Sequence, residues 1–261
     1  VNEYGAPRER IALIPNGIDP VPFAAAAARP RGMEAVLRLD FVGRLEHNQK
    51  GVLHLPDILR ALDDMGVDFT LRIAGQGRRE DELRRRLAAQ VDAGRVIFEG
   101  LLLPEKIPDF LGDCDVFVFT SHFEGCPNAL LEALMAGAVP VCWQLPGTTD
   151  FVVDDGTTGL LAPVGDTESF AGHIAALARD RDRLAAMSRA ARAAALDRFT
   201  HERAAESYAA IFREALADKG AVTPRPWSAF EVNENFRLTP TAAARAFVRR
   251  TLARAGLWRA S

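Results

Sequence analysis

The sequence predicts an α/β protein built around a doubly wound parallel sheet with extra C-terminal helices. Short β-rich runs alternate with helical patterns, and the β-rich runs are apolar with little alternation of period two. Strands of that kind are buried on both faces by helices. The chain has 261 residues, of which 48% are hydrophobic, so it can form a substantial core. We expect the sheet domain at 30–215, a linker or hinge segment at 1–29 and a tail at 216–261.

The elements follow one another in regular βα order. Strands are expected at 36–43, 69–75, 95–100, 115–120 and 138–143, and helices near 53–65, 80–91 and 105–112, with another from Pro127 onward. Beyond residue 181, two Ala- and Arg-rich stretches predict amphipathic helices that cover the domain. In such sheets, ligands bind at the carboxyl ends of the strands. The loops after the first and fourth strands, 43–51 and 120–128, are therefore the candidate site.

The helix after the fourth strand contains an unexpected carboxylate. In SHFEGCPNALLEALMAG (121–137), Pro127 suits a first helical turn, and the helix that follows is apolar on several faces. Glu132 is therefore expected to lie at least partly out of water, where a carboxylate without a partner costs several kcal/mol. Its partner could be an Arg or backbone donor elsewhere in the fold. Because a helix N-terminus attracts anions, a ligand with a phosphate and a sugar diol suits the position better.

Two basic residues follow the first strand. Arg44 and Lys50 bracket a predicted helix start in GRLEHNQKG (43–51), at the same sheet edge as the Pro127 helix. Arginine grips phosphate oxygens in bidentate fashion and lysine supplies a point charge. Together with a helix N-terminus they predict a diphosphate site; the alternative is a solvated surface pair.

Several segments together resemble a known family. They are IPNGID (14–19), VGRLEHNQKG (42–51), IAGQG (73–77), EGCPNALLE with Glu124 and Glu132, AGAVPV and DDGTTGLL. Over positions 11–215 the chain resembles the C-terminal, donor-binding half of a family 4 (group 1) retaining glycosyltransferase. The resemblance implies GT-B architecture, in which two Rossmann-like domains face each other across a cleft and the C-terminal one holds the nucleotide sugar.

The resemblance also implies roles for individual residues. Arg44 and Lys50 would bind the donor diphosphate, Glu132 the ribose hydroxyls, and Glu124 the transferred sugar. Glu124, Arg44 and Lys50 form the implied catalytic set. The implied donor-binding set is Gly43, Arg44, Lys50, Gly75, Glu124, Gly125, Cys126, Pro127, Asn128, Ala129, Leu130 and Glu132, with backbone N–H groups from Gly125 through Leu130 lining the sugar and phosphates. The family usually has a larger apolar residue in place of Cys126, which leaves the sugar open. No cofactor or metal is implied, because the nucleotide-diphospho-sugar is the donor substrate.

Other features of the sequence argue against metal or nucleic-acid binding. The net charge of −3 disfavours nucleic acid. Asp113-Cys114-Asp115 has the D-x-D form of a metal motif, but it opens a strand and is better read as a helix-to-strand turn. The GQGRRE segment (75–80) lacks the third glycine of a dinucleotide fingerprint and predicts a turn near the nucleotide base.

The histidines and cysteines carry weaker signals. His47 and His122 lie in the site loops, where a histidine could titrate near neutral pH; we expect the alternative, that both are solvated loop histidines. The remaining histidines (His54, His173 and His201) show no metal-ligand spacing with Cys or Asp, so no structural zinc is expected. Three cysteines in apolar contexts predict reduced thiols, and no apolar run approaches about 18 residues. We therefore expect a cytoplasmic protein.

The resemblance implies a missing partner as well. Family members carry an N-terminal acceptor domain, and this chain is expected to begin at the interdomain connection, as a truncated piece in preference to a subunit of a split enzyme. Alone it should bind donor without transferring sugar. The basic stretch 241–261 predicts a helix that docks on that domain or, as the alternative, contacts a membrane surface peripherally. Two rival functions are a nucleotide-sugar epimerase of GT-B shape and a non-catalytic nucleotide-sugar-binding subunit.

Overall fold

The computed structural model describes residues 11–27 and 36–217. The chain divides into two compact units, Val1–Ala215 and Leu216–Ser261, and nearly all of the description concerns the first. The predicted basic stretch 241–261 lies outside the described residues. The separation of a linker at 1–29 from the sheet domain stays a prediction.

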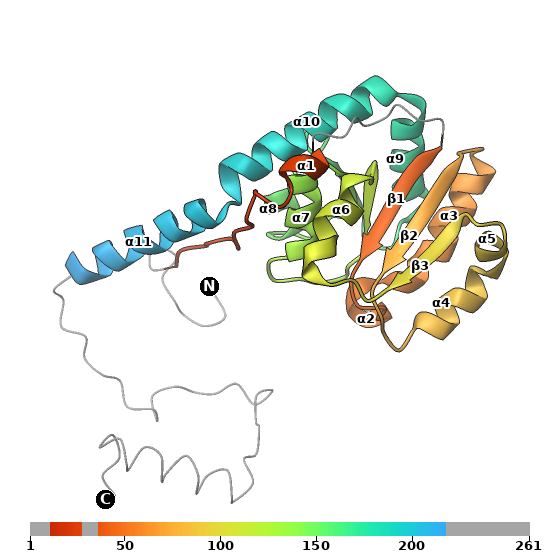
Figure 1. Ribbon diagram of the computed structural model, residues 1–261, viewed down its shortest axis with the longest axis horizontal. Helices are drawn as coiled ribbons and strands as arrows, with labels where there is room; N and C mark the ends of the chain where they lie inside the picture. The colour runs from red at the N-terminus through yellow and green to blue at the C-terminus, as the bar shows by residue number, and fades with distance from the viewer. Residues whose placement is uncertain (1–10, 28–35, 218–261) are drawn as a thin grey trace, which may run out of the picture. The chain divides into compact units, whose positions relative to one another are not determined.

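Six parallel strands form a single sheet in the order β3-β2-β1-β4-β5-β6 (Figure 1). Their bounds are β1 Leu37–Val42, β2 Phe69–Ala74, β3 Val96–Gly100, β4 Val116–Phe119, β5 Val139–Trp143 and β6 Leu160–Ala162. The doubly wound parallel fold and the first five strands agree with the sequence-based expectation. The sixth was not predicted, because its three residues are too few to show a pattern, although it pairs with β5 through Val141 and Leu160.

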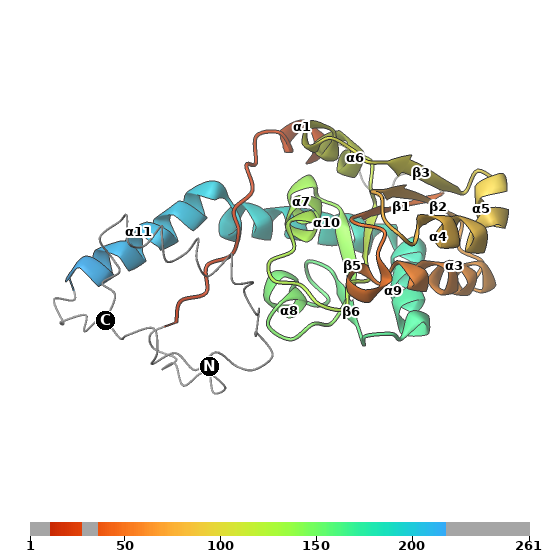
Figure 2. The ribbon, with the colours of Figure 1, turned by 90° about the horizontal axis from the view of Figure 1, so that it is seen from below.

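Helices connect the strands and cover the sheet. Their bounds are α1 Ala24–Ala27, α2 His47–Lys50, α3 Leu55–Asp64, α4 Glu80–Arg86, α5 Ala88–Asp92, α6 Ile107–Gly112, α7 Asn128–Ala136, α8 Thr149–Val152, α9 Thr167–Arg179, α10 Arg181–Arg198 and α11 His201–Ala217. Two short 3-10 turns, Val52–His54 and Pro104–Lys106, precede α3 and α6. Figure 2 shows the sheet between two helical layers, with α6 and α7 on one side and α3 and α9 on the other.

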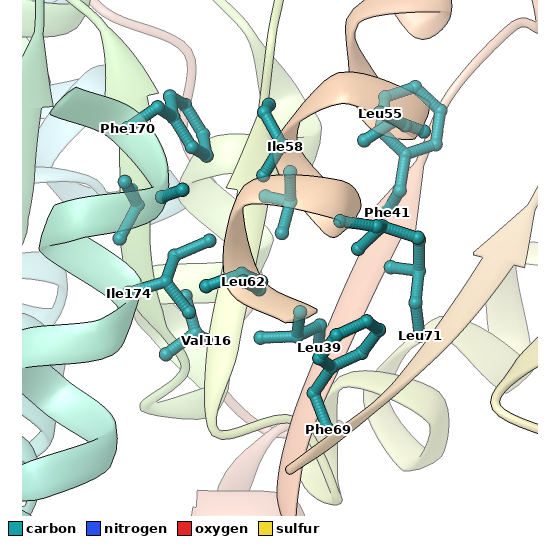
Figure 3. Packing of buried hydrophobic residues seen from close by; sticks show 14 of the residues in the cluster. Leu39, Phe41, Leu55, Ile58, Leu62, Phe69, Leu71, Val116, Phe170 and Ile174 are labelled. Carbon is teal, nitrogen blue, oxygen red and sulfur yellow. The ribbon is translucent and has the colours of Figure 1, made fainter. Parts of the chain in front are cut away.

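The two faces of the sheet bury separate cores, and β4 contributes to both. Val116 and Val118 belong to the core under α3 and α9, whereas Phe117 and Phe119 belong to the core under α6 and α7. From the helices, the first core receives Ile58, Leu62, Phe170 and Ile174 (Figure 3). Alternate residues point to opposite faces of a strand, so a strand covered on both sides must be apolar throughout. This explains the continuous apolar runs in the sequence.

The winding direction changes between β1 and β4. These strands are neighbours, with Leu39 opposite Val116, although two other strands and the helices around them separate β1 from β4 in the sequence. In doubly wound sheets, the crossovers on either side run away from such a point, and ligands bind there at the carboxyl ends of the strands. The loops after β1 and β4 are the ones in which the sequence predicts the site.

The chain enters and leaves the sheet domain at one place. The Ile18 amide donates to the Phe199 carbonyl at 2.8 Å, and the His201 amide donates to the Ile18 carbonyl at 3.3 Å. Gly17 fits against this strand pair because it has no side chain: a Cβ there would lie 2.6 Å from the Thr200 carbonyl oxygen. The IPNGID segment is thus fixed to the start of α11.

Candidate functional site

The loops after β1 and β4 contact each other directly. The His122 amide donates to the Gln49 carbonyl at 2.8 Å, and the Thr120 hydroxyl donates to the Lys50 carbonyl at 2.9 Å. Gly51 makes this approach possible, since its φ is 62° and a Cβ would lie 2.0 Å from the Thr120 carbonyl oxygen. Both the backbone conformation and the close contact require glycine. The two predicted site segments therefore form one surface.

An ion pair joins the predicted residues of these loops. Lys50 Nζ donates to Glu124 Oε1 at 2.6 Å, and the side chains are only 15% and 8% exposed. The Ser121 hydroxyl donates to the same carboxylate oxygen at 2.8 Å. The Gln49 amide donates to the other oxygen at 3.4 Å and accepts a hydrogen bond from the exposed Arg44. Arg44, Lys50 and Glu124 thus belong to a single polar network.

The N-terminus of α7 faces the same edge. Pro127 is its N-cap, and the Pro127 carbonyl accepts hydrogen bonds from the amides of Leu130, at 2.9 Å, and Leu131, at 3.2 Å. The Leu130 amide is therefore used inside the helix, and proline has no amide hydrogen. Of the predicted run, the amides that donate to no acceptor in residues 11–27 and 36–217 are those of Gly125, Cys126, Asn128 and Ala129. These are the N–H groups available to an anion.

Asn16 reaches this helix from the N-terminal segment. Its side-chain amide donates to the Asn128 side-chain oxygen at 2.7 Å, and its backbone N–H donates to Cys126 Sγ at 3.3 Å. Sequence reasoning placed Asn16 in a linker and gave it no site role. Nothing local to IPNGID signals a contact with residues 110 and 112 positions away.

Glu132 is half-buried in α7, as predicted. Burial raises the pKa of its carboxyl above the ordinary value. The described residues supply no hydrogen-bond donor or cation to this side chain, so the Arg or backbone partner considered from the sequence is not present there. The carboxylate carries a desolvation cost that no contact among those residues offsets.

A pocket of about 260 Å³ lies beside the network at the ends of β1 and β2. It is lined by Val42, Gly43, Arg44, Ala74, Gly75, Gln76, Leu101, Leu102 and Ile107. Gly75 shapes it: its φ is 136°, and a Cβ would lie 1.9 Å from the Gly43 carbonyl oxygen. The wall of the pocket is largely apolar. Arg44 lines the pocket and also belongs to the network of Lys50 and Glu124. Lys50, Glu124 and Glu132 do not line it.

The geometry agrees with a family relationship. The sequence signature of the family described as glycosyl transferases group 1 matches residues 37–180, more than half of the chain. The chain belongs to this family. The matched segment contains the six strands of the sheet, the network and α7.

Two relatives of this chain are named as glycosyltransferases. It is 28% identical over 222 residues to the 2-deoxystreptamine glucosyltransferase of Streptomyces kanamyceticus, covering 82% of this chain and 57% of the relative. It is 32% identical over 192 residues to the putative colanic acid biosynthesis glycosyltransferase WcaL of Salmonella typhimurium, covering 70% of this chain and 46% of the relative. The chain therefore spans about half the length of these relatives.

Solved structures place the fold among GT-B glycosyltransferases. Anabaena Alr3699/HepE in complex with UDP and glucose superposes with a TM-score of 0.65 at 24% identity, over 82% of this chain and 58% of that one. A point mutant of S. aureus TarM, in complex with fondaparinux, alpha-GlcNAc-glycerol and UDP, superposes with a TM-score of 0.70 at 17% identity, over 81% of this chain and 41% of that one. At these identities the likeness establishes the fold.

This group 1 glycosyltransferase chain also contains a histidine cluster that the sequence did not predict. The rings of His47, His54 and His122 lie with centroids 5.1–5.3 Å apart, beside the ion pair. His47 and His122 are half-buried, so the expectation of solvated loop histidines is wrong. Burial and the neighbouring charges of His122 and His47 lower the pKa of His54 to about 4, and burial and His122 also lower that of His47. Sequence separation concealed the cluster, since His54 and His122 are 68 positions apart.

The D-x-D segment is used structurally. The Asp115 carboxylate accepts from the Arg38 backbone amide at 3.0 Å and from its guanidinium at 3.2 Å, which ties the starts of β1 and β4 together. This agrees with the predicted helix-to-strand turn. In the described part of the chain, no group of three or more His, Cys, Asp or Glu side chains is arranged to hold a metal ion.

The remaining expectations from the sequence concern the cysteine thiols and membrane-spanning segments. Cys114 and Cys142 are buried, Cys126 is half-buried, and none of the three forms a disulfide. None of the helices within 11–27 and 36–217 has the length and hydropathy needed to span a bilayer.

Proposed function

We propose that this domain binds the nucleotide-diphospho-sugar donor for a retaining, metal-independent glycosyl transfer. One observation carries the proposal: two cations, four uncommitted amides and a carboxylate without a partner among the described residues converge at the carboxyl edge of β1 and β4. Cations and helix N-terminal amides suit a diphosphate, and a carboxylate suits a pair of hydroxyls. A nucleotide sugar presents both.

Arg44 and Lys50 would hold the diphosphate with the amides of Asn128 and Ala129. The exposed Arg44 side chain is free to turn from Gln49 to phosphate oxygens. Lys50 is fixed by Glu124, and the stem of its side chain packs on Gly43. As the leaving group departs, these positive groups would stabilise the negative charge that develops on the diphosphate. This electrostatic role needs no metal ion.

The nucleoside would lie between Glu132 and the pocket. Glu132 is assigned to the ribose hydroxyls, which would supply the hydrogen bonds that its carboxylate lacks. The pocket formed by Gly75, Gln76 and Leu101, with its apolar wall, suits the planar face of a base. HepE and TarM were solved with UDP, so uridine nucleotides are the first ligands to try.

Glu124 would contact the transferred sugar from the loop between β4 and α7. Retention requires an acceptor hydroxyl to approach the anomeric carbon beside the leaving phosphate, within a closed and dry cleft. An N-terminal acceptor domain or subunit would supply the acceptor and the opposite wall. The chain spans about half of its relatives' length, which supports this division of labour.

Titration calorimetry with UDP, GDP, ADP and their common sugars tests the proposal directly. We expect one nucleoside diphosphate to bind, and Arg44→Ala to weaken it roughly ten- to a hundredfold, as expected for loss of a charged hydrogen-bond partner. Arg60→Ala is the matched control, because Arg60 forms an exposed ion pair on α3. An affinity unchanged by Arg44→Ala, or a protein that binds none of the ligands, would contradict the proposal.

A further inference from the structure

His122 makes three hydrogen bonds to two neighbouring segments. Its backbone N–H donates to the Gln49 carbonyl at 2.8 Å. Its ring Nδ1 lies 3.1 Å from the Asn48 carbonyl oxygen, and its Nε2 lies 2.9 Å from His54 Nε2. Two of these bonds hold α2, which ends in Lys50, and the third holds the turn that precedes α3.

These contacts determine the tautomer of each ring. A carbonyl oxygen only accepts, so His122 Nδ1 must carry a proton. In a neutral ring, His122 Nε2 is then the acceptor, and His54 Nε2 must be the donor. His54 is held in its neutral form by burial beside the other two rings. The pair therefore has opposite tautomers: Nδ1–H in His122 and Nε2–H in His54.

The loop fixed by His122 is the loop that carries Glu124. Ser121 and Glu124 flank the histidine within three residues and share the hydrogen bond between hydroxyl and carboxylate at 2.8 Å. On the opposite side, Lys50 belongs to the helix whose carbonyls accept from His122. The relative position of Lys50 and Glu124 thus depends on how His122 joins the two segments.

We propose that His122 is a positioning residue of the donor site, which holds the 120–124 loop on α2 in its Nδ1–H tautomer and thereby sets Glu124 where it contacts the transferred sugar. The inference rests on the proposed role of Glu124. It adds a determinant of donor-sugar affinity that lies outside the phosphate and ribose contacts. His54 acts through His122, as the donor that keeps its Nε2 unprotonated.

The tautomers are measurable without any ligand. We expect long-range ¹H–¹⁵N NMR spectra at neutral pH to show a protonated Nδ1 for His122 and a protonated Nε2 for His54. His54→Gln should preserve the His122 tautomer, because a glutamine amide still donates to its Nε2. A protonated Nε2 on neutral His122 would overturn the proposal.

Binding measurements test whether the position of Glu124 depends on this residue. His122→Leu should weaken a nucleotide sugar about tenfold while leaving the matching nucleoside diphosphate within about twofold, because Lys50 stays at the end of α2 while the loop that carries Glu124 is displaced. His122→Asn should restore most of the loss, since its side-chain amide can donate to Asn48. His201→Leu is the matched control, because His201 is an exposed histidine on α11.

A double-mutant cycle separates positioning from general damage. In a Glu124→Gln background, His122→Leu should cause no further loss of sugar affinity, because the residue through which it acts is gone. Equal weakening of both ligands by His122→Leu, or full additivity in the cycle, would overturn the inference and leave the proposed function intact. Absence of any nucleotide binding by the wild-type chain would overturn both.

Discussion

At the scale of single residues, Glu132 combines a cost to stability with a proposed benefit to binding. Its carboxyl is half-buried without a partner among the described residues, and its pKa is raised by burial. We expect Glu132→Gln to stabilise the ligand-free chain by about 1 kcal/mol at neutral pH, since the desolvated charge is removed. The same variant should bind the nucleoside diphosphate more weakly, because an amide is a poorer acceptor for ribose hydroxyls than a carboxylate.

The pH dependence of that gain has a definite sign. A carboxyl with a raised folded-state pKa destabilises the protein fully above that pKa and has no effect well below the ordinary value of 4.5, where both states are protonated. Urea unfolding of wild type and Glu132→Gln should therefore differ at neutral pH and converge in acid. A variant that is less stable than wild type at neutral pH would show that Glu132 has a partner in solution.

His54 should make stability sensitive to mild acid. Its folded-state pKa is lowered from 6.5 to about 4, so between those values the unfolded chain binds a proton that the folded chain does not. Stability should fall as the pH drops through this window and level off below it. His54→Gln cannot titrate and should lose less over the same range. Urea midpoints of the wild type and His54→Gln across this pH range test the prediction. Equal losses of stability in the two proteins would show that another histidine of the cluster takes up the proton.

The candidate site residues differ in how easily the sequence reveals them. Arg44, Lys50 and Glu132 stand out locally, because a charge next to a strand end or inside an apolar helix is conspicuous. Asn16 and His54 do not, since their site contacts span 112 and 68 positions respectively. Such contacts depend on which strands become neighbours, which residue patterns alone do not specify.

At the scale of elements, the approach of two loops depends on a glycine. Gly51 and Gly66 both have positive φ values, of 62° and 68°, but of these two only Gly51 has a described atom within 4 Å of its missing Cβ. Gly66→Ala should cost about 1 kcal/mol, the usual penalty of a left-handed alanine. Gly51→Ala should cost clearly more and also weaken nucleotide binding, because the 47–51 and 120–124 segments must separate.

Thermal unfolding and calorimetry on the two variants distinguish these effects. Gly66→Ala keeps the same backbone strain without the steric conflict, so it serves as the control for folding. If Gly51→Ala and Gly66→Ala lost similar stability and nucleotide affinity were unchanged, the close contact at Gly51 would not be needed for the site.

The elements themselves were largely predictable. Strands β1 to β5 are visible in the sequence as apolar runs. Their alternation with helical patterns predicts a parallel sheet. The edge strand β6 was not predicted, because its three residues are too few to show a pattern. The helix after β4 was predicted to begin at Pro127 and begins at Asn128, with the proline as its cap.

At the scale of the whole molecule, binding and transfer should be separable. The residues proposed to bind the donor lie within the described part of the chain, whereas the acceptor site is proposed to lie in a second domain. We expect the purified 261-residue chain to bind donor without appreciable transfer, and transfer to appear when an N-terminal acceptor domain is fused or added in trans. Mass spectrometry of products, with matched donor, a panel of sugar and lipid-linked acceptors, and EDTA present, measures this.

Two results would change that interpretation. Robust turnover by the chain alone would show that a single domain suffices for catalysis. Turnover by the completed enzyme that disappears with EDTA would contradict a metal-independent mechanism. Asp113 and Asp115 would then be candidate metal ligands.

The joining of Ile18 to the start of α11 has a mechanical consequence. The two segments run parallel, so tension applied between residue 11 and residue 217 loads their two backbone hydrogen bonds in shear. Ahead of this clamp, the same tension loads the hydrogen bonds from Asn16 to Asn128 and Cys126, which join the N-terminal segment to α7. A pulling experiment should register a small early rupture, which Gly17→Val would abolish by forcing the segments apart, while the main unfolding peak keeps its height. Movements of any domain attached through residue 11 would therefore reach the β1–β4 edge through Asn16, while the clamp at Ile18 holds the rest of the segment in place.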